Sequence, residues 1–486
     1  MLLRRYNLLF VWVIFVILVT LTFLTLFPVT AGSTTKSLST NFTLINLGSS
    51  AANGVIQYLR PDGTEWRTSE TFTIEPYGGQ AIFRQYMEGP GYIATPGQGS
   101  VIVSADQPLA AVVQIRALGQ IPTSGAYVGF PTGSDTFYVP LVARQRGTAS
   151  GIANSQIIIQ NTGTEATNIE IKFIDWFNGN LVYTKTGITV NRGASYLYDL
   201  ADEVNLPSNW IGSAVVKATT EGGSIAVVSN FFTGPHGMQT FNAFPKESVS
   251  REWVIPLFTS RLANGLSAPV TIQNLSDSVI PIGGAVMTCT VDSTSPNPTP
   301  TTFVVSNTTP ISPSMAYAWN PVIDMSLPSQ WLGSCRVSSL QDIIAFVQLR
   351  FIGTDKAAAY EAIDARSAGK TVFVPLVAKR LPNGFASAVT IQNLNINASA
   401  NVTLTYKATL GYSPSELVLY RVIPAGGSLI QNHRVGSDHP QGVPLPDNWQ
   451  GSLIVESDQP IAAFVQLDFL GSGGDPYMAH NAFTIP

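Results

Sequence analysis

The sequence predicts an all-β protein: four tandem immunoglobulin-like β-sandwich modules that follow an N-terminal hydrophobic helix. The first observation is a set of motifs that returns about every 115 residues, which indicates a repeated structural unit. The second is the alternation of apolar and polar residues in short runs such as IEIKF, which begins at Ile169 and is typical of strands with one buried face. The third is a turn signal about every 8–12 residues, which divides each repeat into about seven strands, as in an immunoglobulin-like sandwich.

The N-terminal segment 1–31 carries the hydrophobic helix. Residues 8–27 contain no charged residue and follow two arginines. As a helix they would extend about 30 Å, enough to span a bilayer core, with the start of the segment in the cytoplasm. Val29 and Ala31 occupy the −3 and −1 positions of a signal-peptidase site, so a cleaved signal peptide and a membrane anchor both remain open. Either places the rest of the chain outside the cytoplasm, secreted or anchored at the cell surface.

The repeated motifs define the modules. Three repeats open with related runs: VPLVARQRG at Val139, IPLFTSRLANG at Ile255 and VPLVAKRLPNG at Val374. Each repeat then has an apolar run ending in an asparagine that we expect to bond its own backbone, at Asn161, Asn274 and Asn393, with a weaker copy at Asn46. The predicted modules are 38–134, 136–249, 252–368 and 371–486. Short linkers between them predict an elongated, semi-rigid row of four.

A tryptophan motif occurs in three modules, as LPSNWIGS, LPSQWLGS and LPDNWQGS around Trp210, Trp331 and Trp449. Proline turns the chain, glycine allows close backbone approach, and the indole supplies a large apolar body that can fill the end of a sandwich. The alternative is a sugar-binding platform used three times. We favour the structural corner, because the loops before the three motifs do not match and large aromatic residues in repeated modules mostly serve packing.

The two cysteines, Cys289 and Cys335, both lie in the third module at inward-facing positions. In an oxidising compartment this arrangement predicts a disulfide that joins the two sheets, with two unpaired buried thiols as the alternative. Closing the loop would stabilise the module by about 4 kcal/mol on a chain-entropy treatment.

The sequence predicts no catalytic residue, cofactor or metal site. It contains no glycine-rich phosphate loop, GxSxG elbow or HExxH motif. His433 and His439 share a loop without a third zinc ligand, and the cluster of Asp199, Asp202 and Glu203 is more typical of a solvated turn than of a calcium site. A net charge of −4 disfavours nucleic acid as a partner, because binding to phosphates requires a basic face.

The ordered set of VPLV, xIQN, a PxGG-type turn, LPxxWxGS, QPIAAFVQ and NAF resembles repeated, mostly uncharacterised modules in secreted or surface proteins of filamentous bacteria. The resemblance covers nearly all of 38–486 and is weakest in the first module, which lacks the VPLV run and the tryptophan motif. It implies immunoglobulin-like sandwiches and brings no catalytic residues with it.

These observations predict a non-enzymatic surface or secreted protein that acts as a structural stalk or adhesive element. Its partners would be glycans or other surface proteins, and residues 8–27 would contact the membrane if they are retained. One alternative is carbohydrate binding through exposed aromatics beside hairpin turns, with Trp66 and Trp176 as the ligand-facing residues. A second is a secreted hydrolase with a site between modules.

Overall fold

The structure is a computed structural model that describes residues 38–117, 122–324 and 326–485. The predicted signal peptide or anchor, residues 1–31, lies outside the described residues. Residues Leu38–Pro486 form one compact unit. In its described part this unit is all-β, with antiparallel sheets, three short 3-10 helices and no α-helix. No helix in that part is long and apolar enough to cross a membrane.

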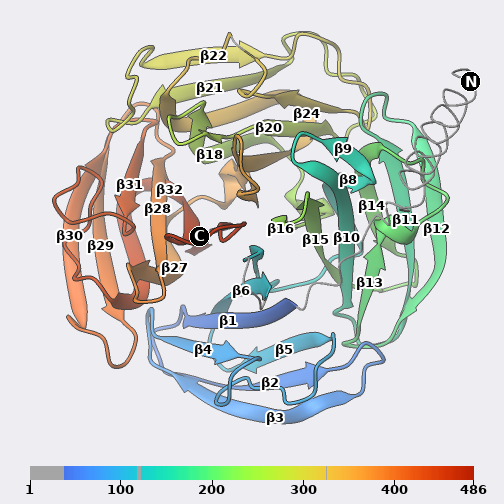
Figure 1. The fold of residues 1–486 in the computed structure, drawn as a ribbon, viewed down its shortest axis with the longest axis horizontal. Coiled ribbons are helices and arrows are strands. Elements are labelled where there is room, and N and C mark those ends of the chain that lie inside the picture. The colour runs from blue at the N-terminus through green and yellow to red at the C-terminus, as the bar shows by residue number, and fades with distance from the viewer. Residues whose placement is uncertain (1–37, 118–121, 325, 486) are drawn as a thin grey trace, which may run out of the picture. The chain divides into compact units, whose positions relative to one another are not determined.

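The described strands fall into four groups, because each strand pairs only with strands of its own stretch of the chain. We call residues 38–128, 136–245, 250–364 and 369–485 groups 1 to 4. In Figure 1 group 1 is blue at the bottom, group 2 green at the right, group 3 yellow to brown at the top, and group 4 orange to red at the left.

Groups 1 and 2 each form two sheets. The sheet orders of group 1 are β3-β2-β5 and β4-β1-β6-β7, and those of group 2 are β12-β11-β14-β8-β17 and β13-β10-β15-β16, with β9 beside β10. The strands of group 1 are β1 (Leu38–Asn46), β2 (Ala52–Leu59), β3 (Glu65–Ile74), β4 (Gln80–Arg84), β5 (Ser100–Ala105), β6 (Leu109–Ala117) and β7 (Ser124–Val128). Group 2 and the turn after it comprise β8 (Thr136–Arg144), β9 (Arg146–Thr148), β10 (Gly151–Asn161), β11 (Thr167–Asp175), β12 (Leu181–Val190), β13 (Ser195–Asp199), η1 (Leu200–Asp202), β14 (Trp210–Ala218), β15 (Ile225–Thr233), β16 (Gly237–Asn242), β17 (Phe244–Pro245) and η2 (Lys246–Ser248).

In groups 3 and 4 one long strand, β24 or β32, belongs first to one layer and then to the other, so the layers join into one sheet. Group 3 and the turn after it comprise β18 (Ser250–Ser260), β19 (Leu266–Ser267), β20 (Val270–Asn274), β21 (Ala285–Val291), β22 (Thr302–Ser306), β23 (Ala316–Trp319), β24 (Trp331–Phe351), β25 (Ala357–Glu361), β26 (Ile363–Asp364) and η3 (Ala365–Ser367). Group 4 comprises β27 (Gly369–Lys379), β28 (Phe385–Asn393), β29 (Ala400–Ala408), β30 (Glu416–Ile423), β31 (Ser428–Asn432), β32 (Trp449–Phe469), β33 (Met478–Asn481) and β34 (Phe483–Ile485).

The same pairing order recurs in all four groups. The strand that ends in the recurring asparagine (β1, β10, β20 or β28) lies between a short strand and the strand that leads to the last hairpin. That hairpin ends in β7, β16, β25 or β33. The opening strands β8, β18 and β27 have no counterpart among the described strands of group 1, which agrees with the missing VPLV run.

Alternation of side chains explains why these segments form strands. In β11, Ile169, Ile171 and Phe173 are at most 2% exposed, whereas the charged residues between them reach solvent. A strand with this pattern buries one face against a second layer and leaves the other face to water. The predicted two-residue period is therefore confirmed in β11, and the sheets are sandwich-like.

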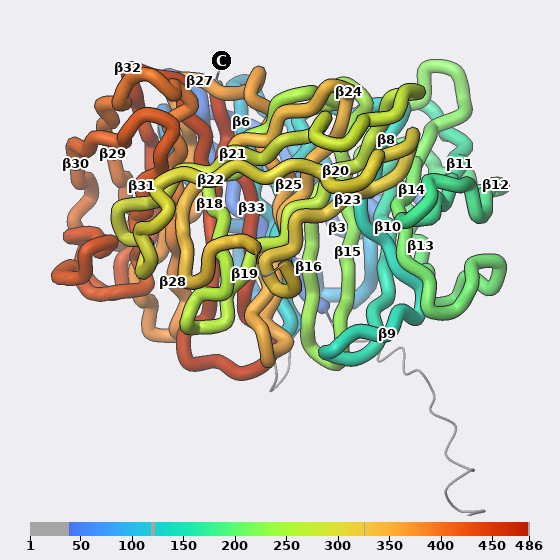
Figure 2. Tube along the Cα trace, turned by 90° about the horizontal axis from the view of Figure 1, so that it is seen from above, coloured from blue at the N-terminus to red at the C-terminus, as the bar shows by residue number. Residues whose placement is uncertain are grey.

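The groups surround a common centre (Figure 1). There β7 contacts β16, β16 contacts β25, β25 contacts β33, and β33 contacts β7 again. In Figure 2 the turns that lead into β16 and β33 lie together at the lower edge. The predicted elongated row of modules is wrong, because the first and last groups contact each other. Linker length limited the distance between neighbours but did not determine the direction in which successive groups turn.

Candidate functional site

The tryptophans of the recurring motif are buried: Trp210 is 5% exposed, and Trp331 and Trp449 are 0% exposed. The indole Nε1 of Trp331 donates to the carbonyl of Pro300 at 2.9 Å, and that of Trp449 to the carbonyl of Pro414 at 3.0 Å. The Nε1 of Trp210 is buried without a hydrogen-bond partner in the described part of the chain. All three rings face the apolar cores rather than a hollow.

The residue before each of these tryptophans has a left-handed backbone. The φ angles of Asn209, Gln330 and Asn448 are 59°, 57° and 62°. Asparagine tolerates this conformation better than most residues with a side chain, because its short polar group bonds locally. The polar residue before the ring therefore has a backbone role.

The glycine two positions after each tryptophan lies under the indole ring. A Cβ atom at Gly212, Gly333 or Gly451 would come within 2.2, 2.5 and 2.4 Å, respectively, of that ring. Since real Cβ atoms do not approach so closely, the WxG spacing follows from the packing of the ring onto its own strand.

A basic residue that ends the opening strand or directly follows it completes this corner, and sequence reasoning missed it. Arg144 donates to the carbonyl of Leu206 at 2.9 Å, and Arg261 donates to the carbonyl of Leu327. In group 4, Lys379 donates to the carbonyl of Val443 at 3.0 Å. The sequence does contain a signal for this residue, because the runs VPLVAR, FTSR and VPLVAK all end in a basic residue. The strand pattern alone, however, does not show that this residue contacts the LPxxW loop.

The recurring asparagines are buried, and their side chains join two loops by hydrogen bonds. Each is 0% exposed, accepts the backbone N–H two residues later, and donates from Nδ2 to carbonyls of two loops. Asn161, for example, donates to the carbonyls of Glu165 at 2.7 Å and Val190 at 2.9 Å. The remaining members are Asn46, Asn274 and Asn393. The expected bond of each asparagine to its own backbone is confirmed, and the second loop contact adds a tertiary role.

The predicted disulfide is present between Cys289 and Cys335, which are 0% and 1% exposed. It does not join two sheets as expected. Cys289 on β21 lies directly opposite Cys335 on β24 in the same sheet. Residues directly opposite each other on neighbouring strands point to the same face of the sheet. The inward direction of both cysteines is therefore compatible with a bond within one sheet as well as with a bond between two layers.

The two tryptophans considered for ligand contact are partly buried. Trp66 packs on the core of group 1 and donates from Nε1 to the carbonyl of Thr95 at 3.1 Å. Trp176 packs on the core of groups 2 and 3, and its carbonyl accepts the N–H of Ala316 at 3.3 Å. Both side chains therefore have structural contacts.

Of the histidine and carboxylate candidates, His433, Asp199 and Glu203 are built into the fold, whereas His439 and Asp202 are exposed. His433 is 0% exposed and lies 3.2 Å from both Ser387 Oγ and Tyr406 OH, and burial lowers the pKa of His433 to about 3. Asp199 caps η1 by accepting the N–H of Ala201 at 2.9 Å, and Glu203 accepts from Tyr198 and Asn205. The described residues contain no group of three side chains that could hold a metal ion.

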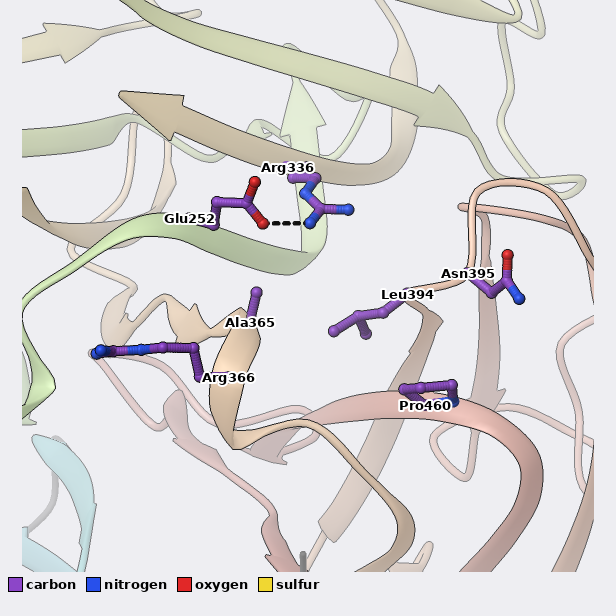
Figure 3. Close-up of a pocket in the computed structure, with 7 residues that line it drawn as sticks. All are labelled: Glu252, Arg336, Ala365, Arg366, Leu394, Asn395 and Pro460. Atoms are coloured by element: carbon purple, nitrogen blue, oxygen red, sulfur yellow. Dashed lines mark hydrogen bonds and ion pairs between the residues drawn. The ribbon is translucent and has the colours of Figure 1, made fainter. Parts of the chain in front are cut away.

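Two shallow hollows lie on the surface. The first, of about 350 Å³, lies between groups 3 and 4 (Figure 3) and is lined by Glu252, Arg336, Ala365, Arg366, Leu394, Asn395 and Pro460. Its cations are already paired: Arg336 with Glu252, and Arg366 with Asp364 at 2.6 Å.

The second hollow, of about 450 Å³, is lined by His236, Thr354, Asp355, Lys356 and the glycine loop 472–474. Lys356 there pairs with Asp468 at 3.0 Å. Each hollow therefore contains at least one cation that already has an ion-pair partner.

The four strands that meet at the common centre are β7, β16, β25 and β33, and we call them the central strands. These strands and the turns beside them carry a buried polar cluster that sequence reasoning missed. At one end the Asp475 carboxylate accepts the backbone N–H groups of Met238 at 2.8 Å and Ala357 at 3.1 Å, while its own N–H donates to the carbonyl of Pro122 at 2.8 Å. Asp475, which belongs to group 4, therefore contacts group 2, group 3 and the turn before β7 of group 1. Its burial raises the pKa of Asp475 well above its usual range.

A chain of hydrogen bonds joins the ends of the central strands. Asn242 exchanges two bonds with the backbone of Val128, the carboxylate of Glu361 accepts the N–H of Asn242 at 2.5 Å, and Asn481 donates to the carbonyl of Glu361 at 2.8 Å. Burial raises the pKa of Glu361 to about 7. The recurring NAF motif marked two of these positions in the sequence.

Neighbouring groups dock through the recurring glycine-serine and the PxGG-type turn. The serine Oγ donates to the turn glycine of the next group: Ser100 to the carbonyl of Gly193 at 2.5 Å, and Ser334 to that of Gly426 at 3.2 Å. In group 2, Ser213 accepts from Gln273 of group 3 at 2.6 Å. The last contact closes the cycle, because Ser452 of group 4 donates to the carbonyl of Gly78 of group 1 at 2.6 Å.

Comparison with known proteins leaves the family open. No protein-family model matches the chain, and no curated protein matches it. Among solved structures, Thermotoga maritima 1070 aligns with 24% of this chain and 97% of its own, at 16% identity and a TM-score of 0.20. Red sea bream transglutaminase aligns with 46% of this chain and 30% of its own, at 11% identity and a TM-score of 0.11. The BSP domain of a biofilm associated protein aligns with 93% of this chain and 92% of its own, at 10% identity and a TM-score of 0.13. TM-scores this low support no conclusion about fold or function.

Proposed function

We propose that this chain is a non-enzymatic, extracytoplasmic protein, secreted or anchored at the cell surface, that serves as an adhesive or structural element. We further propose that groups 1 to 4 are four immunoglobulin-like modules of the repeat family that the sequence resembles. The shared pairing order of the four groups supports this division.

The observation that carries the proposal is where the recurring residues lie. The tryptophans and asparagines are buried inside groups, and the serines of the glycine-serine pairs bond between groups. Residues that recur for catalysis or ligand binding would instead converge on an open site. A repeat whose shared residues build and dock modules fits a structural scaffold, in which ligand contact is left to the variable surface.

The closed cycle of contacts favours an adhesive head over a stalk. In a stalk the modules follow one another end to end, so the first and last modules lie far apart. Here β7 of group 1 contacts β33 of group 4. Glycans and other surface proteins are the partner classes that we propose for such a head. The partly buried state of Trp66 and Trp176 gives no support to carbohydrate binding through these two residues.

The Cys289–Cys335 disulfide supports an oxidising compartment, since disulfides form and persist outside the cytoplasm. Cell fractionation tests this directly: we expect the protein in the envelope or medium, with its disulfide formed. Sequencing the mature terminus separates the two forms, because Gly32 indicates release and Met1 indicates a tether. Recovery in the cytoplasm with free thiols contradicts the proposal.

Adhesion is tested by comparing a deletion strain with its parent on glycan-coated and protein-coated surfaces, and by applying the purified protein to a glycan array. We expect reduced attachment of the deletion strain, restored by the wild-type chain and also by Trp66→Ala. Turnover of glycan or peptide substrates by the purified protein contradicts the non-enzymatic assignment.

A further inference from the structure

The contact between group 4 and group 1, which we call the closing seam, has the same construction as the contacts between groups 1 and 2 and between groups 3 and 4. A serine that follows a WxG motif donates to a turn glycine at the closing seam (Ser452 to Gly78, 2.6 Å) and between groups 3 and 4 (Ser334 to Gly426, 3.2 Å). Consecutive groups are held together by short linkers. The closing seam joins the two ends of the described chain, so only non-covalent contacts hold it.

The closing seam has its own apolar and polar contacts. Ile45 and Ala110 of group 1 pack with Phe373 and Ile454 of group 4 in a buried cluster that is separate from the cores of both groups. On strands β1 and β32 the neighbours of Ile45 and Ile454 point into the sandwiches, so these two isoleucines face only the seam.

Tyr77 is the centre of the polar part of the seam. Its ring lies edge-on to Phe373 at 5.4 Å, and its OH donates to Glu456 at 2.8 Å. Its carbonyl accepts from Lys407 at 2.7 Å, and Gln80 donates to the carbonyl of Pro375 at 2.8 Å. The two faces of the seam are therefore different and complementary.

The closing seam lacks one bridge that the other contacts have. At the ends of the central strands, the side chains of Asn242, Glu361 and Asn481 each reach the preceding group. The equivalent position in group 1 is Val128, which has no polar side chain to reach Asn481. The seam that no linker holds is thus also the one without this hydrogen bond, although Asp475 of group 4 still donates its backbone N–H to the carbonyl of Pro122 of group 1 at 2.8 Å.

We propose that the closing seam also forms between two copies of this chain, so that group 4 of one copy docks on group 1 of the next. This inference rests on the proposed division into four modules. A contact between two unlike faces closes a ring within one chain or joins chains head to tail. A dimer that exchanges the seam makes the same contacts per chain as two monomers, so the balance depends on concentration. The two faces of one chain have an effective concentration relative to each other that is typically about millimolar for short connections. Closure within one chain dominates when the protein concentration is below this value, and exchange between chains becomes favourable where copies are crowded.

Complementing variants of the chain from Gly32 to Pro486, which contains the whole compact unit, test the proposal. Ile45→Asp disables the group 1 face, and Ile454→Asp disables the group 4 face. Each variant alone has one usable face, so we expect a monomer by light scattering. An equimolar mixture has one intact pair of faces, and we expect its mass to double. A mixture that stays monomeric, while both variants keep the near-UV circular dichroism of the wild type, overturns the proposal.

The exposed edge strand β30 provides the matched control, because Val422 is 60% exposed there and pairing of this edge would also produce dimers. Val422→Asp, added to both variants, should leave the dimer of the mixture intact. If it abolishes the dimer, the edge and not the seam joins the copies, and the proposal is wrong.

Refolding the wild type without reductant is the second measurement, which applies even if an aspartate variant does not fold. We expect monomer after refolding at low concentration, and a dimer that survives dilution after refolding at high concentration. Monomer under both conditions overturns the proposal. Loss of folding by both aspartate variants instead contradicts the division into modules, and so separates failure of the proposed architecture from failure of head-to-tail docking.

Discussion

The carboxylate of Asp475 accepts the backbone N–H of Met238 at 2.8 Å, although 237 residues separate the two in the chain. The same carboxylate accepts the N–H of Ala357, so one side chain ties three strand groups together. A fully buried carboxylate is tolerated here because backbone donors satisfy it. It identifies the cycle of groups as a specifically bonded assembly.

Replacing Asp475 should therefore destabilise the whole unit. Asp475→Ala leaves buried N–H groups unpaired, each of which costs about 1–3 kcal/mol. Asp475→Asn keeps one acceptor oxygen and should lose less. Denaturant unfolding measures both losses, with the exposed Asp277→Ala as the control. Equal stability of Asp475→Ala and the control contradicts this role.

Glu361 should make stability depend on pH. Burial raises its pKa from 4.5 to about 7, so the folded chain retains a proton that the unfolded chain releases. Its contribution to the free energy of unfolding is therefore greatest at about pH 4.5 and below, and falls as the pH rises to about 7. We expect Glu361→Gln to match the wild type near pH 5 and to exceed it at pH 8, by about 1–3 kcal/mol.

The comparison with Glu361→Gln is needed because two histidines act in the opposite direction. Burial lowers the pKa of His433 to about 3 and that of His480 to about 4, so their contributions are lost as the pH falls below about 6.5. The difference between Glu361→Gln and the wild type cancels these contributions. A difference that does not change between pH 5 and pH 8 rules out the predicted titration of Glu361.

The corner tryptophans should matter through packing. Trp449→Ala removes a fully buried ring and should lower the free energy of unfolding by about 3–5 kcal/mol. Trp66→Ala removes a partly buried ring and should cost less. Urea unfolding followed by circular dichroism gives both values. If Trp449→Ala has wild-type stability but loses binding to a glycan, the corner is a ligand site after all.

The disulfide should stabilise group 3. Replacing both cysteines, as Cys289→Ala with Cys335→Ala, should lower the free energy of unfolding by about 4 kcal/mol on a chain-entropy treatment. Reductant should have a similar effect on the wild type and none on the double variant. Calorimetry with and without reductant makes the comparison. A wild type that does not respond to complete reduction contradicts the prediction.

Local patterns predicted much of the molecule correctly. The two-residue period of IEIKF identified a strand and its buried face, and the asparagine that ends VTIQN identified a turn to which its side chain bonds. The WxGS spacing pointed to packing, which fits the buried rings in the structure. These features depend on residues close in sequence, so the backbone and its nearest side chains are enough to predict them.

The sequence by itself therefore determined that the described part of the chain is all-β, that runs such as IEIKF are strands, where the tryptophan corners lie, and that Cys289 and Cys335 face inward. Only the tertiary structure decided that these cysteines are neighbours in one sheet, that Ser452 reaches Gly78, and that Asp475 bonds to Met238. The physical reason is that side-chain alternation specifies the face of a strand but not its partner. Contacts between residues hundreds of positions apart depend on how whole groups of strands turn and dock, which no local pattern encodes.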